Sequence, residues 1–256
     1  MSKFAIIGYG KMGKYYDKAI SADYIVDVVS IANKAYFRSV EDFVSMHPAV
    51  DLVIVSTPSE THFSIAKTLL ESDYNVLVEK PICLSVNKSL NLENLAEERG
   101  KILYQSTLER YNPVVSFIKK NVDLSHVSKI RSSRFGFQPN RANLEGPVFD
   151  LGIHEVDLYF YLVSGKNIPW DIEVGYSSDP KRELLLYMST GEIVRCDLMN
   201  KYITRDNLKL DLNLSNQNNP MLQMVQEILY KGPNINEIWS NEIKILEKFN
   251  NNKIQL

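Results

Sequence analysis

Short apolar segments alternate with helix-forming segments through residues 1–120, and this order restricts the fold more than any other feature of the chain. The apolar segments predict strands at Lys3–Ile7, Tyr24–Ile31, Leu52–Ser56, Asn75–Val78 and Ile102–Gln105. The segments between them predict helices at Lys11–Ser21, Ser39–Met46, Thr61–Ser72 and Val86–Arg99. Strands that are apolar on both faces are typical of a parallel sheet covered on both sides. The order therefore predicts an α/β domain with a doubly wound parallel sheet.

Residues 121–256 follow a different pattern, in which polar and apolar residues alternate within each strand. Such alternation predicts an open, mostly antiparallel sheet with one face in water, and hence an α+β domain. The predicted strands are Lys129–Phe137, Ile172–Tyr176, Glu183–Met188, Ile193–Asn200 and Leu208–Leu214. The predicted helices are Phe149–Val163, Met221–Tyr230 and Ile238–Phe249, of which the last can pack back on the first domain.

Charge and composition exclude several classes of partner. The 29 Lys and Arg residues and 31 Asp and Glu residues are scattered, so the chain has no basic surface for nucleic acid or an anionic membrane. No apolar run approaches the roughly 20 residues that cross a bilayer. Met1–Lys3 lead into the first predicted strand without the pattern of a signal peptide, so we expect none. Cys83 and Cys196 lie outside any metal or redox spacing and are predicted to be buried thiols. We therefore expect a cytoplasmic protein that binds a small molecule.

A glycine-rich turn follows the first predicted strand and opens the first predicted helix. Its first glycine permits a tight turn, the second allows backbone to approach a pyrophosphate, and the third allows close packing of helix on strand. The helix N-terminus attracts phosphate. The alternative is a tight turn without a ligand. The predicted cofactor-binding residues of this turn are Gly8, Tyr9, Gly10, Lys11, Met12 and Gly13.

The second predicted strand lacks the acidic residue that usually binds the adenosine ribose of NAD. Its end reads Ser30–Lys34 and contains no carboxylate. Asn33 can hydrogen-bond the ribose, whereas Lys34 or Arg38 can meet the 2′-phosphate of NADP. The sequence leaves NAD and NADP both open as the cofactor.

The turn after the third predicted strand lies where ligands bind in open α/β sheets. Ser56, Thr57, Pro58 and His62 are candidates to line the dinucleotide there. Turn formation and helix capping explain Thr57 and Ser59 equally well. For His62, a structural role at the start of the helix is the favoured alternative.

Glu79, Lys80 and Pro81 follow the fourth predicted strand, so Lys80 is expected in the same crevice. A partly desolvated lysine beside a nicotinamide can polarise a substrate oxygen or help to transfer its proton. The alternative is an ordinary exposed lysine beside a turn proline.

Asp150, His154 and Asp157 have helical spacing and form a polar stripe on an otherwise apolar predicted helix. Asp150 can orient His154, which can then exchange a proton with a hydroxyl group. Gly152 is expected to keep this face open to substrate. The alternatives are that Asp150 caps the helix and that His154 is a core residue. A metal site is less favoured, because no third His, Cys or carboxylate nearby has the spacing of a metal ligand.

These motifs together resemble the glucose–fructose oxidoreductase, inositol dehydrogenase and MocA family. The resemblance implies an N-terminal Rossmann domain that binds NAD(P) and a C-terminal α+β domain that forms a dimer or tetramer through its sheet. It also implies catalytic roles for Lys80, Asp150 and His154, and positions near the nicotinamide for Glu79 and Gln105. The motifs that carry it are GYGKMG (8–13), STPSETH (56–62), EKP (79–81), ERYNP (109–113) and GPVFDLGIHEVD (146–157).

The sequence thus predicts an NAD(P)-dependent oxidoreductase that acts on a secondary hydroxyl or ketone. The ERYNP segment is similar to ERFNP in family members that act on nucleotide-linked sugars, so the expected substrate is a sugar, sugar nucleotide or cyclitol. The missing ribose acid favours an alternative, a catalytically silent regulator that binds a dinucleotide or sugar on the same scaffold. Reduction of a non-sugar double bond or imine ranks last.

Overall fold

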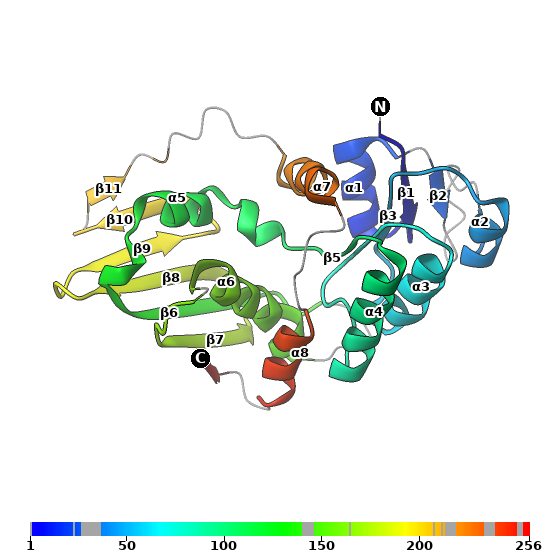
Figure 1. Ribbon diagram of the computed structural model, residues 1–256. Helices are drawn as coiled ribbons and strands as arrows, with labels where there is room; N and C mark the ends of the chain where they lie inside the picture. The colour runs from blue at the N-terminus through cyan, green and yellow to red at the C-terminus, as the bar shows by residue number, and fades with distance from the viewer. Residues whose placement is uncertain are drawn as a thin grey trace. The chain divides into compact units, whose positions relative to one another are not determined.

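The computed structural model describes residues 2–22, 24–26, 37–139, 146–163, 165–206, 208–210, 212, 219–232, 239–249 and 253–256 (Figure 1). The chain forms two compact units. The first comprises Met1–Ser106 and Asn218–Lys244, and the second comprises Thr107–Gln217 and Ile245–Leu256. Among the described residues, no helix is both long and apolar enough to cross a membrane.

A five-stranded parallel sheet forms the centre of the first unit, with strand order β2-β1-β3-β4-β5. The chain moves across the sheet in one direction from β1 to β2 and in the other from β3 to β5. Right-handed crossovers therefore place α1 on one face and α3 and α4 on the other. The strands are β1 (Phe4–Ile7), β2 (Tyr24–Val26), β3 (Leu52–Val55), β4 (Val76–Val78) and β5 (Leu103–Gln105). The helices are α1 (Lys11–Ile20), α2 (Val40–Met46), α3 (Ser59–Glu71), α4 (Val86–Arg99) and α7 (Pro220–Lys231).

Buried and partly buried contacts hold the late segment of the first unit to the rest of that unit. Helix α8 (Ser240–Glu247) begins with Ser240, whose backbone N and Oγ donate to the Glu93 carboxylate at 2.7 and 2.9 Å. Glu242 accepts a hydrogen bond of 2.7 Å from Gln105 Nε2. The Trp239 ring packs edge-on against Tyr104. The first unit is therefore assembled from two distant stretches of chain.

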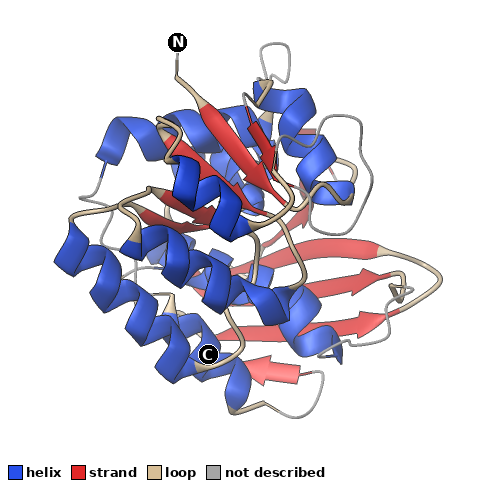
Figure 2. Cartoon of the chain, turned by 90° about the vertical axis from the view of Figure 1, so that its right-hand side faces the viewer, coloured by secondary structure: helices blue, strands red, loops and turns tan. Residues whose placement is uncertain are grey.

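A seven-stranded sheet forms the second unit, in the order β11-β10-β9-β8-β6-β7-β12. Among the described strands of this sheet, only β6 and β7 pair in parallel, so the predicted mostly antiparallel sheet is confirmed. Its long strands lie side by side in Figure 2. The strands are β6 (Val127–Gly136), β7 (Trp170–Tyr176), β8 (Lys181–Met188), β9 (Ile193–Asp197), β10 (Tyr202–Arg205), β11 (Leu208–Leu210) and β12 (Lys253–Gln255). Its helical segments are η1 (Leu108–Tyr111), α5 (Pro113–Asn121), η2 (Leu124–His126), η3 (Val148–Gly152) and α6 (Ile153–Val163).

Among the described residues of the second unit, strands β10 and β12, helix α5 and the short turns η1 and η2 were not predicted. Strands β10 and β12 are only three to four residues long, too short for a periodic signal. The start of helix α5 does have a sequence signal, because Asn112 accepts a hydrogen bond from Val114 N and Pro113 occupies the first helical position.

In the first unit, the end of the predicted strand 24–31 lies outside the described residues.

Both cysteines are buried, as predicted. Burial raises the pKa of Cys196 to about 12 and also raises the pKa of Cys83. Both thiols are therefore protonated at neutral pH, which suits a structural role.

Candidate functional site

Steric contacts require the first and third glycines of the glycine-rich turn. Gly8 has a φ of +89°, and a Cβ on it would lie 2.7 Å from Thr57 Cγ2. A Cβ on Gly13 would lie 2.1 Å from the Gly8 carbonyl oxygen. Gly10, by contrast, is the N-cap of α1, and a Cβ there would meet no described atom within 4 Å. The turn is thus tightly packed on its protein side and open at its middle glycine, as a pyrophosphate cradle requires.

The turn lies at the point where the strand order of the sheet reverses. β1 and β3 are neighbours and end together, with Ile7 paired to Val55. Ser56 then continues the pairing, because its backbone N donates to Ile7 O at 2.8 Å and its Oγ donates to Gly8 O at 2.7 Å. This switch point is where open α/β sheets bind ligands. Ser56 therefore holds the glycine turn in shape.

The other residues of the two turns have different surroundings. The Tyr9 hydroxyl donates to Asp17 on α1 at 2.5 Å, so this ring is directed along the helix. Lys11 is exposed and Met12 is half-buried. Thr57 Oγ1 accepts from Thr61 Oγ1 at 2.7 Å, and Thr61 Oγ1 also lies 2.6 Å from the Pro58 carbonyl oxygen. Asn33, the predicted ribose-binding residue, lies outside the described residues.

His62 is buried and connects the turns that follow β3 and β4. Its Nδ1 lies 2.8 Å from the Pro81 carbonyl oxygen, and its Nε2 lies 2.8 Å from the Thr57 carbonyl oxygen. Burial lowers the pKa of His62, although both carbonyl contacts oppose this shift. Because both ring nitrogens face backbone, the structure supports the alternative in which His62 holds the two turns together.

Lys80 lies at the carboxyl end of β4, in a turn that is fixed by its neighbours. The backbone N of Ile82 donates to Gln105 Oε1 at 2.8 Å, and the Lys80–Pro81 peptide bond is cis. Since Gln105 Nε2 donates to Glu242, both ends of the Gln105 amide are used within the first unit. Lys80 itself is partly exposed. Gln105 thus holds the turn that contains Lys80, by accepting a hydrogen bond from the backbone of Ile82.

Glu79 belongs to a buried polar cluster beneath the same turn. The Tyr16 hydroxyl lies 2.8 Å from Glu79 Oε1 and 2.9 Å from Ser106 Oγ. Burial raises the pKa of Tyr16 well above its usual value, and the Glu79 charge raises it further. Tyr16 therefore stays protonated and donates to Glu79, which fixes this carboxylate at the end of β4.

In the second unit, Asp150 and His154 lie at the junction of a π-turn and a regular α-helix. Asp150 lies in the π-turn Val148–Gly152 and accepts from the Tyr176 hydroxyl at 3.4 Å. His154 follows in the first turn of α6 and is half-buried. Such π-turns are frequent at functional sites. The predicted uniform helix from residue 149 is therefore irregular at its start.

The prediction that Gly152 keeps the helix face open to substrate is wrong. A Cβ on Gly152 would lie 3.4 Å from Ile254 Cδ1 and 3.5 Å from Leu246 Cδ2. Gly152 therefore faces apolar side chains inside the second unit. Its small size serves packing at the start of α6.

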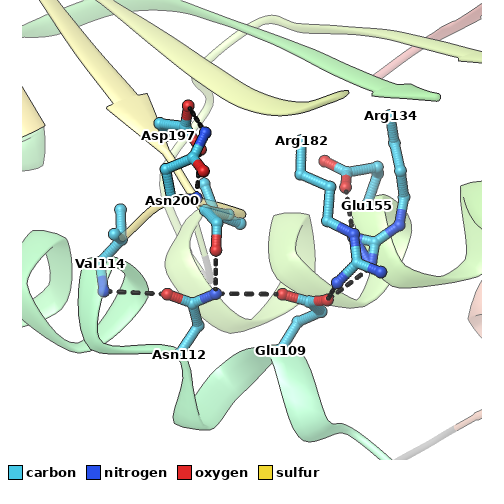
Figure 3. Close-up of polar contacts among 9 residues, drawn as sticks. Glu109, Asn112, Val114, Arg134, Glu155, Arg182, Asp197 and Asn200 are labelled. Atoms are coloured by element: carbon cyan, nitrogen blue, oxygen red, sulfur yellow. Dashed lines mark hydrogen bonds and ion pairs between the residues drawn. The ribbon is translucent and has the colours of Figure 1, made fainter. Parts of the chain in front are cut away.

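A buried charge network surrounds the Glu109 carboxylate and was not predicted from the sequence (Figure 3). Glu109 Oε1 accepts from Arg134 Nη2 at 2.5 Å and from Arg182 Nη1 at 2.9 Å. Arg134 Nη1 also lies 3.4 Å from Glu155 Oε1. The Arg134 and Glu155 side chains are 2% and 3% exposed, so this pair is almost fully desolvated. Charges at such depth are rare unless they are paired.

We expect the stability of the protein to depend on pH through Glu155. Burial raises the pKa of Glu155 above its ordinary value of 4.5, an effect that Arg134 opposes and Glu109 reinforces. The stabilising contribution of the protonated carboxyl is present below the unfolded-state pKa and is lost as the pH rises through the folded-state pKa. Over this interval, the free energy of unfolding of the wild type should fall relative to that of Glu155→Gln. Chemical unfolding at a series of pH values measures this difference, and a constant difference would contradict the expectation.

Comparisons with known proteins agree with the fold and the glycine turn. Residues 2–107 match the family model GFO_IDH_MocA, described as an oxidoreductase family with an NAD-binding Rossmann fold. The UDP-N-acetylglucosamine 3-dehydrogenase of Acidithiobacillus ferrooxidans is 24% identical over 176 residues, which cover 64% of this chain and 55% of that protein. The scyllo-inositol 2-dehydrogenase (NADP(+)) IolW of Bacillus subtilis is 23% identical over 183 residues, covering 62% of this chain and 51% of that protein. The chain thus aligns with about half the length of these curated relatives.

Solved structures share the fold over nearly the whole chain. The structure of GnnA, a UDP-N-acetylglucosamine 3-dehydrogenase from Acidithiobacillus ferrooxidans, has a TM-score of 0.78 and 16% identity, covering 96% of both chains. A dehydrogenase (MviM) from Clostridium difficile has a TM-score of 0.77 and 18% identity, covering 96% of this chain and 98% of that one. The glycine turn, the two sheets and the match over residues 2–107 thus agree with a Rossmann domain similar to that of the GFO_IDH_MocA family, followed by a second unit with the same fold as in these dehydrogenase structures.

Proposed function

We propose that the protein is an NAD(P)-dependent oxidoreductase that transfers hydride between a nicotinamide and a secondary hydroxyl or ketone carbon. The observation that carries the proposal is the glycine turn at the switch point of the parallel sheet. There the N-terminus of α1 and the open side of Gly10 fit a pyrophosphate, while Gly8 and Gly13 are packed too closely for any side chain. The residues present therefore fit a dinucleotide.

In this proposal, Lys80 and His154 act on the substrate oxygen and its proton, and Asp150 acts through His154. The nicotinamide, when bound, accepts or supplies the hydride. Lys80 donates a hydrogen bond to the substrate oxygen and stabilises the negative charge that develops there. His154 takes the hydroxyl proton during oxidation and returns it during reduction. Asp150 stabilises the protonated form of His154 through its negative charge.

The proposed substrate class is a sugar, a sugar nucleotide or a cyclitol. The names of the relatives support it, since they include dehydrogenases of UDP-N-acetylglucosamine, scyllo-inositol and glucose 6-phosphate. All three molecules have ring carbons that bear secondary hydroxyl groups, the group that hydride transfer to NAD(P) oxidises. The relatives include both NAD(+) and NADP(+) enzymes, so both cofactors belong in the test. Assembly through the second unit's sheet stays a prediction.

Thermal unfolding with added cofactor tests the proposal directly. NAD, NADH, NADP and NADPH are added separately, and a cofactor that binds only the folded state raises the melting temperature. At a hundred times its Kd, the expected stabilisation is about 2.7 kcal/mol. The stabilising cofactor is then incubated with sugars, sugar nucleotides and inositols while the absorbance of reduced nicotinamide is followed. Absence of stabilisation by all four would refute the dinucleotide site, and binding without turnover of any substrate would favour the silent regulator.

A further inference from the structure

Two adjacent residues of the η1 turn contact different partners in the second unit. Glu109 accepts hydrogen bonds from Arg134 on β6 and Arg182 on β8. Arg110 donates from Nε and Nη2 to Asp157 Oδ1 on α6, at 2.9 and 2.5 Å. Both η1 side chains are 9% exposed, so these contacts are made away from solvent. The η1 turn thus joins the sheet to the helix that bears His154.

Helix α6 receives two of these buried contacts within four residues of its start. Glu155 is paired with Arg134, and Asp157 is paired with Arg110. At about 100° per residue, Glu155 lies about 100° to one side of His154 around the helix axis and Asp157 about 60° to the other. His154 is half-buried between these two buried positions. The ion pairs therefore flank the face of the helix on which His154 lies.

Stability alone does not account for such an arrangement, because apolar residues of similar volume often hold a helix to a sheet equally well. An arginine differs from an apolar residue in its rigid guanidinium, which fixes both the distance and the direction of its partner. Helix α6 begins directly after the π-helix Val148–Gly152. Two ion pairs on either side of His154 restrict rotation of α6 about its own axis.

We propose that Glu109 and Arg110 are positioning residues that set the orientation of His154, Arg110 through Asp157 and Glu109 through Arg134 and Glu155. This inference rests on the proposed role of His154 in proton transfer. It also gives the ERYNP segment a role other than substrate contact. Glu109, Arg110 and Asn112 all use their polar atoms for contacts within the second unit. Asn112 Nδ2 donates to Leu198 O at 2.9 Å, and Figure 3 shows Asn112 beside Glu109.

NMR of the histidine rings tests the inference independently of any activity. The chain contains four histidines, and a His154→Gln variant identifies the His154 signal. Arg110→Met, Asp157→Asn and Glu109→Gln should each change the chemical shift and the titration midpoint of His154. The signals of His47 and His62, which lie in the first unit, should stay unchanged. The matched control is Arg131→Met, which removes an exposed ion pair with Glu173 from β6 and should leave His154 unaffected.

Kinetics then separates positioning from a general loss of structure. Turnover of the three variants should fall roughly tenfold to a hundredfold, because small misplacements of a catalytic group are costly. The Kd for the cofactor should stay at the wild-type value. Arg110→Lys should restore stability more than turnover, because lysine keeps the charge without the planar geometry. Asp157→Asn keeps the shape of the side chain while removing its charge. It therefore tests the same ion pair if Arg110→Met does not fold.

Two outcomes would overturn the inference, and the first of them does not depend on the substrate. Folded variants with an unchanged His154 signal would show that the ion pairs do not orient this ring. Equal losses of turnover and stability in Arg110→Lys and Arg110→Met, with an unchanged His154 titration, would assign the pairs to folding alone. If the wild-type protein has no oxidoreductase activity, the proposed function fails, but comparing the His154 signals of these variants with that of Arg131→Met, which also removes a charge, would still test the restraint.

Discussion

Gly13→Ala is expected to abolish dinucleotide binding and to destabilise the first unit. The added Cβ would lie 2.1 Å from the Gly8 carbonyl oxygen, which is backbone and cannot rotate away. Ser56 also binds this carbonyl at 2.7 Å, so the turn must shift as a whole. We expect a loss of at least about 3 kcal/mol in the free energy of unfolding, the upper end of ordinary overpacking. Chemical unfolding and cofactor titration measure the two effects.

Gly10→Ala is the matched control for this substitution. Its added Cβ meets no described atom within 4 Å, and the Gly10 φ of −73° is open to alanine. The variant should therefore keep the wild-type stability. Because the new methyl group points toward the space proposed for the pyrophosphate, cofactor affinity should still fall. Equal stability of Gly13→Ala and wild type would contradict the packing argument, and wild-type affinity in Gly10→Ala would contradict the placement of the pyrophosphate.

Lys80→Ala and His154→Ala are each expected to lower turnover by about 10² to 10⁴-fold, the usual contribution of a general acid or base. Cofactor affinity should change little, because the glycine turn is untouched. The double variant should lose less than the product of the two single losses, because in the proposed mechanism both residues act on the same oxygen and proton. Steady-state kinetics with saturating cofactor, together with cofactor titration, measures these quantities.

Surface residues of the same types provide the controls for these two variants. Lys67 is paired with Glu71 on α3, and the His126 side chain is 66% exposed. Lys67→Ala and His126→Ala should keep wild-type turnover. Wild-type rates in both Lys80→Ala and His154→Ala would rule out the proposed mechanism. A loss confined to one of them would remove the other from it.

The order of elements and the glycine turn were predictable because they depend on neighbours in sequence. A buried apolar strand followed by glycine and a helix has few other ways to fold. The confirmed parallel and antiparallel sheets follow from the difference between strands that are apolar on both faces and strands that alternate. Patterns between neighbours in sequence thus predict the architecture and the glycine turn.

The charge network around Glu109 was not predictable in this way. Glu109 and Arg182 are 73 positions apart, and no periodicity connects them. Glu155 interrupts an apolar helix, but a single glutamate is normally exposed, so its burial gave no signal. The pattern also placed Asp157 on a stripe with His154, whereas the structure pairs it with Arg110. Contacts between distant segments decide these roles, and no periodicity or spacing in a single sequence indicates such contacts.

The return of residues 218–244 to the first unit has a consequence for protein engineering. A fragment that ends at Ser106 would retain the glycine turn but would leave Glu93, Tyr104 and Gln105 without the partners that Ser240, Trp239 and Glu242 supply. Such a fragment would expose apolar surface and leave polar groups unsatisfied. Residues 1–106 are therefore not expected to fold independently, and a chimaera that contains the first unit needs residues 218–244 as well.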